Sequence, residues 1–178
     1  MNRRIFVEKK PAFDVESQKI LAELQEFTPL TSLKQYVIYD VFNAEEESWE
    51  QSKRVLLDSV ADIAHYEPPK NAGFPAFAME YLPGQYDQRA DSAEQAIQLV
   101  TGHRPTIRTG KYFVFDQVDS TDLNKIKKYL INSVDSQEKR LDVLELPEIP
   151  KPDEVESISE FTEFTEEQLQ AFHKEWSF

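Results

Sequence analysis

The densest group of hydrogen-bonding side chains lies in residues 81–93, with the sequence Tyr-Leu-Pro-Gly-Gln-Tyr-Asp-Gln-Arg-Ala-Asp-Ser-Ala. The Pro-Gly pair predicts a turn, and a helical pattern follows the polar residues. Amides, carboxylates and a guanidinium come close together on Gln85, Asp87, Gln88, Arg89 and Asp91. Polar loops at helix starts bind ligands or contact neighbouring segments. The alternative is a turn that satisfies itself, with Arg89 paired to Asp87 or Asp91.

Further cations follow at Arg104, Arg108 and Lys111. They could lie along one face of a strand, with Arg89 nearby. Such a face would be a docking surface for an acidic partner domain. The alternative is a solvated strand edge.

Several kinds of chemistry are excluded or disfavoured. The chain has no cysteine, which rules out disulfides, thiolate zinc sites and cysteine nucleophiles. Its three histidines lie in separate segments, so we expect no metal site. The acidic run at residues 45–47 is typical of a first helical turn rather than of a catalytic site. We expect no catalytic residue in this chain.

A nucleotide site is equally disfavoured. The nearest match to a phosphate-binding loop runs from Gly102 to Gly110 and Lys111. Its glycines are too far apart, and Tyr112 stands where a Ser or Thr would bind magnesium. We therefore expect no cofactor bound to this chain.

Composition limits the remaining classes. The 178 residues carry a net charge of -13, and residues 141–178 hold 11 acids against 2 bases. Nucleic-acid binding would require a basic face, which this balance does not provide. The first residues include no apolar segment of a signal peptide, and no stretch is long enough for a membrane helix. We expect a soluble cytoplasmic protein without nucleic-acid or membrane partners.

Hydrophobic spacing predicts two similar series of elements. The first series begins with a strand at 4–8, a helix at 20–27 and a buried strand at 36–42. A helix follows, capped by Asn43 and Glu46, and it carries Trp49, Leu56 and Ile63 on one side. Residues 65–73 form a linker. The second series begins with a strand at 74–81 and a helix capped by Ser92 and Gln95. It continues with a strand at 107–118, a helix that begins at Asp119 and a last strand within 139–146.

These two series match in sequence as well as in order. The offset is 72 residues between Glu8 and Glu80, 76 between Asp40 and Asp116, and 74 between Ser59 and Ser133. A period above 70 residues is too long for a solenoid. We expect an α+β fold of two tandem β-α-β-α-β lobes, residues 1–66 and 67–146, which share a core as a symmetric dimer would.

The tail is different in character. Prolines and acidic residues after 147 predict an extended linker, and Thr165 with Gln168 predicts a capped helix. The apolar face of that helix has no partner in the sequence. We therefore expect residues 147–178 to be a linker and the start of a further domain in a longer protein.

The segment 81–93 closely resembles the Leu-Pro-Gly-Gln-aromatic-Asp-Gln-Arg-Ala-Asp-Ser run near the N-terminus of large, single-chain phosphoribosylformylglycinamidine synthase, the amidotransferase of the purine pathway. Residues 132–135 resemble the Asn-Pro/Ser-Val-Asp run that follows there, and residues 106–112 resemble the Val-Arg-Ile-Gly-Lys-Tyr strand of the small PurS-type subunit. The resemblance covers residues 3–145, and the acidic tail resembles the start of the family's linker domain.

The resemblance implies a fold and a role. The PurS-type subunit is a β-α-β-α-β dimer, and the large enzyme carries a fused region similar to that dimer. The family makes formylglycinamidine ribonucleotide from formylglycinamide ribonucleotide, ATP and ammonia released from glutamine. Its ATP and magnesium sites lie in a synthetase domain, and its glutaminase nucleophile is a cysteine, which this chain lacks. The implied role is a non-catalytic module that holds these two domains together.

Two functions are therefore compared. In the first, the module contacts the synthetase and glutaminase domains through residues drawn from Gln85, Asp87, Gln88, Arg89, Asp91, Arg108 and Lys111, and is by itself a monomeric pseudo-dimer. In the second, the chain is an autonomous small-molecule sensor or binding module. A module should leave apolar surface unpartnered, whereas a sensor should bind a ligand alone.

Overall fold

One antiparallel sheet organises the chain. The computed structural model describes residues 1–147 and 161–176, and in this part five α-helices and six strands form an α+β fold. The strands are β1 (Arg3–Lys9), β2 (Leu33–Phe42), β3 (Asp62–His65), β4 (Ala76–Tyr81), β5 (Thr106–Phe115) and β6 (Ser136–Glu138). The helices are α1 (Val15–Gln25), α2 (Trp49–Leu56), α3 (Gln88–Thr101), α4 (Ser120–Leu130) and α5 (Glu166–Trp176). The predicted fold class, α+β, is confirmed.

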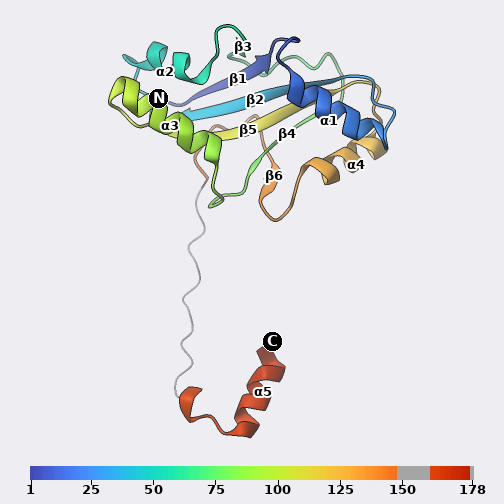
Figure 1. Ribbon diagram of the computed structural model, residues 1–178, viewed down its shortest axis with the longest axis vertical. Coiled ribbons are helices and arrows are strands. Elements are labelled where there is room, and N and C mark those ends of the chain that lie inside the picture. The colour runs from blue at the N-terminus through green and yellow to red at the C-terminus, as the bar shows by residue number, and fades with distance from the viewer. Residues whose placement is uncertain (148–160, 177–178) are drawn as a thin grey trace.

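The strand order places the two halves of the sequence side by side. It runs β3-β1-β2-β5-β4-β6, so each half contributes three adjacent strands and the order is the same from either edge. The halves meet at β2 and β5, which pair over their full length from Leu33 opposite Phe115 to Phe42 opposite Thr106. The strands predicted at 36–42 and 107–118 are thus the two central strands (Figure 1).

The structure corrects the alignment of these central strands. Asn43 directly follows β2 and Gln117 lies two residues after the end of β5; both have a positive φ (57° and 46°), and they lie 74 positions apart. Leu56 and Leu130, which end α2 and α4, are also 74 apart. The offset of 76 at Asp40 is therefore wrong by two residues. A shift of two leaves every side chain on the same face of a strand, so the pattern fitted both registers.

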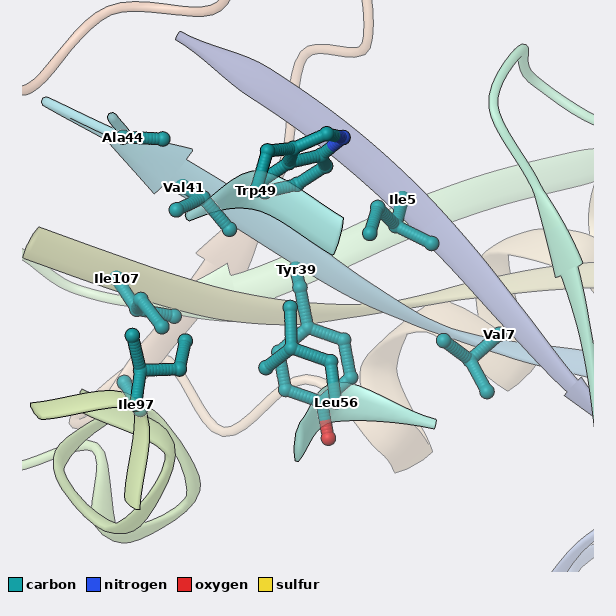
Figure 2. Close-up of a cluster of buried hydrophobic side chains, with 10 residues drawn as sticks. Ile5, Val7, Tyr39, Val41, Ala44, Trp49, Leu56, Ile97 and Ile107 are labelled. Atoms are coloured by element: carbon teal, nitrogen blue, oxygen red, sulfur yellow. The ribbon is translucent and has the colours of Figure 1, made fainter. Parts of the chain in front are cut away.

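Helices from different halves pack together over one face of the sheet. Figure 1 shows α2 and α3 at one end of this face and α1 and α4 at the other. In the first cluster, Trp49 and Leu56 of α2 and Ile97 of α3 cover Tyr39 and Val41 of the sheet (Figure 2). In the second, Leu24 of α1 and Ile126 of α4 pack with three phenylalanines of β4 and β5, Phe77, Phe113 and Phe115. Neither cluster belongs to one half alone.

The other face of the sheet is crossed by the chain after β6. Lys139 donates its backbone N–H to Ala78 and its ammonium to Asp40 and Glu80, at 2.8 and 2.5 Å. Arg4 binds Asp40 at 2.5 Å and donates to the carbonyls of Leu141 and Val143. These charges hold residues 139–143 against the open face. The last strand predicted within 139–146 is therefore wrong, and the strand is β6, just before it.

Two predicted helix starts are also wrong. Asn43 has a positive φ and accepts from His103, and α2 begins later, after Ser48. Ile63, expected on that helix, lies in β3 and is 42% exposed. The helix expected at Ser92 begins four residues earlier. In both places a polar residue close to the true start mimicked a cap.

Other local predictions are confirmed. Asp119 caps α4 by accepting from the backbone N–H of Asp122. Thr165 and Gln168 exchange the two hydrogen bonds of a capping box at the start of α5. Phe172 of α5 packs with Phe161 and Phe164. The expectation that the apolar face of this helix has no partner in the chain is therefore wrong at Phe172. Residues 148–160, where the acidic linker was predicted, lie outside the described residues.

Gly110 is expected to be essential to the open face. A Cβ there would lie 2.7 Å from the Met79 carbonyl oxygen and 3.1 Å from Cδ of Lys139. We predict that Gly110→Ala lowers the free energy of unfolding by about 1–3 kcal/mol, because the backbone contact cannot relax. Urea unfolding measures the change. Thr106→Ala, at an exposed position of the same strand, is the control and should change stability by less than about 0.5 kcal/mol. Equal stability of Gly110→Ala and the control would contradict the packing described.

Candidate functional site

A cavity of about 620 Å³ opens over the middle of the sheet, on the face that carries the helices. Its floor is formed by Val37, Gly110 and Lys111, from the pairing of β2 with β5. Its walls are the end of β4, the start of α3 and the loop between α4 and β6. The volume is in the range of small-molecule sites. Four predicted site residues line it, namely Asp87, Gln88, Arg89 and Lys111.

The turn before α3 is fixed by its backbone. Leu82 donates to the carbonyl of Asp135 at 2.9 Å, and Gln85 donates back to Leu82 at 3.1 Å. Gly84 takes a φ of 90°, which a side chain would strain. The predicted Pro-Gly turn is confirmed, and its contact with Asp135 brings the α4–β6 loop beside the start of α3.

Asp87 anchors this corner. Its carboxylate accepts from the backbone N–H of Ala90, as an N-cap, and from both the N–H and the hydroxyl of Thr109 at 2.8–3.0 Å. One side chain therefore starts α3 and ties it to β5. Three donors of the chain bind this carboxylate, so we assign it a structural role.

Arg89 forms neither of the pairs that a self-satisfied turn would use. Its only hydrogen bond within the described residues is a long one, 3.5 Å, to the hydroxyl of Tyr39. Burial by itself would lower the pKa of Arg89, but the bond to Tyr39 and the charges of Glu16 and Asp87 outweigh it, so the pKa is raised. The guanidinium stays charged and faces the cavity with no carboxylate in ion-pair contact among the described residues.

Asp91 belongs to a separate cluster on the outer side of α3. It accepts from Gln95 and Tyr86, and these bonds, with Arg104, lower the pKa of its carboxyl. Arg104 also pairs with Glu94 at 3.0 Å. The charge of Arg104 is thus matched within the chain.

The predicted cationic face does not form. Arg108 and Lys111 lie three residues apart in β5, and side chains alternate between the faces of a strand, so they point in opposite directions. Arg108 donates to the carbonyl of Tyr81 and lies 3.6 Å from Glu80. Lys111 binds Glu16 of α1 at 2.6 Å. Burial would raise the pKa of Glu16, but the hydrogen bond and charge of Lys111 outweigh it and lower the pKa.

The two glutamines of the segment have a different position. Gln85 and Gln88 are exposed, and within the described residues neither side chain forms a hydrogen bond. Tyr86 between them is 71% exposed. These side chains are available to a partner.

Sequence reasoning missed part of the cavity. Asn132, Asp135 and Ser136 line its wall, although the sequence marked residues 132–135 only as part of a resemblance. No local pattern connects them with α3, which lies far away in the sequence. Their place is decided by the backbone contact between Leu82 and Asp135.

The described residues also bear on metal binding, tyrosine ionisation and membrane insertion. No group of three or more His, Asp or Glu that could hold a metal gathers within residues 1–147 and 161–176. The buried phenols of Tyr36 and Tyr112 pack against each other on the open face. Burial, with Glu8 and Tyr112, raises the pKa of Tyr36 to about 12, so it is protonated at neutral pH. In the described part of the chain, no helix is long and apolar enough to span a membrane.

Comparison with known proteins adds no assignment. No protein-family model matches the chain, and no curated protein matches its sequence.

Substitution of Asp87 should destabilise the fold, whereas substitution of the nearby Arg89 should not. We predict that Asp87→Ala lowers the free energy of unfolding by about 1–3 kcal/mol, because the cap and the bonds to Thr109 are lost together. Arg89→Ala should change it by less than about 0.5 kcal/mol, because no ion pair is broken. Chemical denaturation of the purified chain measures both.

Asp14 provides the matched control for this comparison. It caps α1 as Asp87 caps α3, but among the described residues its carboxylate accepts only from Ser17, at 3.3 Å. Asp14→Ala should therefore cost less than Asp87→Ala. If Arg89→Ala lowered the free energy of unfolding more than Asp87→Ala does, the role of Arg89 would be structural.

Proposed function

We propose that this chain is the non-catalytic N-terminal module of an ATP- and glutamine-dependent phosphoribosylformylglycinamidine synthase. In this proposal residues 1–66 and 67–146 are two PurS-like β-α-β-α-β lobes that form an internal pseudo-dimer. The observation that carries it is the strand order β3-β1-β2-β5-β4-β6, in which each half supplies a β-α-β-α-β series and the two halves pair through β2 and β5. A fused dimer of PurS-type subunits should have this arrangement.

The three segments that resemble the synthase support the proposal by their position. Residues 81–93 form the turn and the start of α3, residues 106–112 lie in β5, and residues 132–135 precede β6. All three contribute to the same cavity. The resemblance is therefore concentrated at one place in the fold.

The role that follows is mechanical. The module would hold the synthetase and glutaminase domains of the parent chain in register, so that ammonia passes between them without release to water. ATP and magnesium would be bound by the synthetase domain, outside this chain. Residues 147–178 would be the linker and the first helix of the next domain.

The candidate contact residues divide into two groups. The first group binds other residues of the chain and would stabilise the conformation of this surface; it consists of Asp87, Asp91, Arg108 and Lys111. Gln85, Gln88 and Arg89 are free to contact another domain. We place the domain contact on the two glutamines, whose side chains form no hydrogen bond within the described residues.

The second candidate function is an autonomous small-molecule sensor or binding module. The cavity favours it, because its size and mixed lining suit a ligand. The two candidates differ in what the intact protein does: only the first requires the rest of a synthase.

Contact through the glutamines can be tested in the intact synthase. We predict that Gln85→Ala with Gln88→Ala lowers glutamine-dependent synthesis by about tenfold, as loss of roughly 1.4 kcal/mol of contact energy would. Synthesis from added ammonia and glutamine hydrolysis should both survive, because neither active site is altered. Steady-state rates of the three reactions measure the effect.

Gln98→Ala, an exposed position on the outer side of α3, is the control and should leave all three rates unchanged. An equal fall of both half-reactions, with a matching loss of thermal stability, would place the glutamines in a structural role.

Isolated, the chain should be a monomer that binds no nucleotide. Its two central strands already pair with each other, and the edge strands β3 and β6 have only four and three residues. Sedimentation should show a single monomeric species. Calorimetric titration with magnesium-ATP should give no signal, and micromolar binding would show that an ATP site had been overlooked.

A further inference from the structure

The cavity over β2 and β5 is lined by a cation and an anion, Arg89 and Asp135, that are weakly held by the chain itself. Arg89 on its α3 wall has no carboxylate within ion-pair distance among the described residues. Asp135, on the wall formed by the α4–β6 loop, has no cation within that distance in the same part of the chain. Its side-chain contact is a long one, 3.3 Å, from the amide of Asn132. Two opposite charges thus line one cavity without pairing with each other.

The other charged side chains of the lining are held by partners within the chain. Lys111 is bound to Glu16 at 2.6 Å. The carboxylate of Asp87 is filled by Thr109 and Ala90. Glu80 is held from the open face of the sheet by Lys139. Among the described residues of the lining, Arg89 and Asp135 are therefore the charged side chains that are held least by the chain itself, each by one long hydrogen bond.

The rest of the lining suits a short organic molecule between these charges. Ser92 and Asn132 supply neutral hydrogen-bonding groups, while Val37, Met79 and Leu130 supply apolar surface. A few polar groups converging on apolar walls are typical of small-molecule sites.

We propose that this cavity binds a small amino-acid-like zwitterion. Its carboxylate pairs with the guanidinium of Arg89, which matches the geometry of a carboxylate through two parallel N–H donors. Its ammonium group donates to the carboxylate of Asp135. A simple anion could pair with Arg89 but would leave the carboxylate of Asp135 without a partner. A simple cation could pair with Asp135 but would leave Arg89 without one.

The site belongs to one half only. The N-cap Asp14 of α1 corresponds to the N-cap Asp87 of α3, so Val15 and Glu16 occupy the positions of Gln88 and Arg89. The first half therefore has an acid where the ligand's carboxylate would bind, and the stoichiometry should be one per chain.

This inference does not rest on the proposed function, and the isolated chain tests it. The probes are glycine, β-alanine, γ-aminobutyrate and ε-aminocaproate, which separate the two charges by increasing lengths, together with butyrate and butylamine. We expect one zwitterion of the series to bind at least about tenfold more tightly than either singly charged compound in calorimetric titration. Its length reports the span between Arg89 and Asp135.

Variants then assign the two contacts. Arg89→Gln and Asp135→Asn should each weaken binding of that zwitterion by about tenfold or more, and the double variant should bind no better than butyrate does to the original chain. Arg54→Gln removes the same charge from an exposed arginine of α2 and should leave binding unchanged. Thermal unfolding of each variant shows whether the fold is retained.

Three results would overturn the proposal: no saturable binding of any zwitterion, butyrate binding as tightly as the best zwitterion, or an equal loss in Arg54→Gln. Each leaves the synthase assignment standing, because that assignment is tested through Gln85 and Gln88 in the intact enzyme.

Discussion

The pairing of β2 with β5 is the constraint on which the rest of the structure depends. It joins the halves along ten residues of each strand and removes two exposed edges, each of which would otherwise offer unpaired backbone groups to other chains. It also brings α2 against α3 and α1 against α4, so that each hydrophobic cluster draws on both halves. Neither half could bury these side chains alone.

The open face is held differently. Its charges alternate in sign from Arg4 of β1 to Asp40 of β2, then to Lys139 after β6 and to Glu80 of β4. These side chains are at most 14% exposed. Buried ion pairs contribute less to stability than to specificity, because desolvation offsets much of their attraction. Here they determine where residues 139–143 cross the sheet, and Gly110 provides the space for Lys139. The same crossing closes the cluster of Phe6, Ile38 and Tyr112 from solvent.

The candidate site depends on both arrangements. Its floor is the central strand pair, and its walls are held by Asp87 on Thr109 and by Leu82 on Asp135. A rigid frame of this kind leaves a few side chains free, and those side chains carry the two proposals. Gln85 and Gln88 are exposed and suit a neighbouring domain, although Gln88 also lines the cavity, whereas Arg89 and Asp135 suit a ligand in the cavity.

By itself the sequence determined the fold class, the central strands, the turn at Gly84 and the caps at Asp119 and Thr165, because these features depend on periodicity and on residues close together in the chain. It also marked Asp87 and Arg89 as members of one polar segment. The spacing of Arg108 and Lys111 within a predicted strand also places them on opposite faces. Only the tertiary structure decided that Asp87 is bound by Thr109 while Arg89 is left without an ion pair among the described residues, and that Asp135 joins the cavity. These outcomes depend on strand register and on contacts between distant segments. A local pattern carries no information about either, since a two-residue shift of register preserves it.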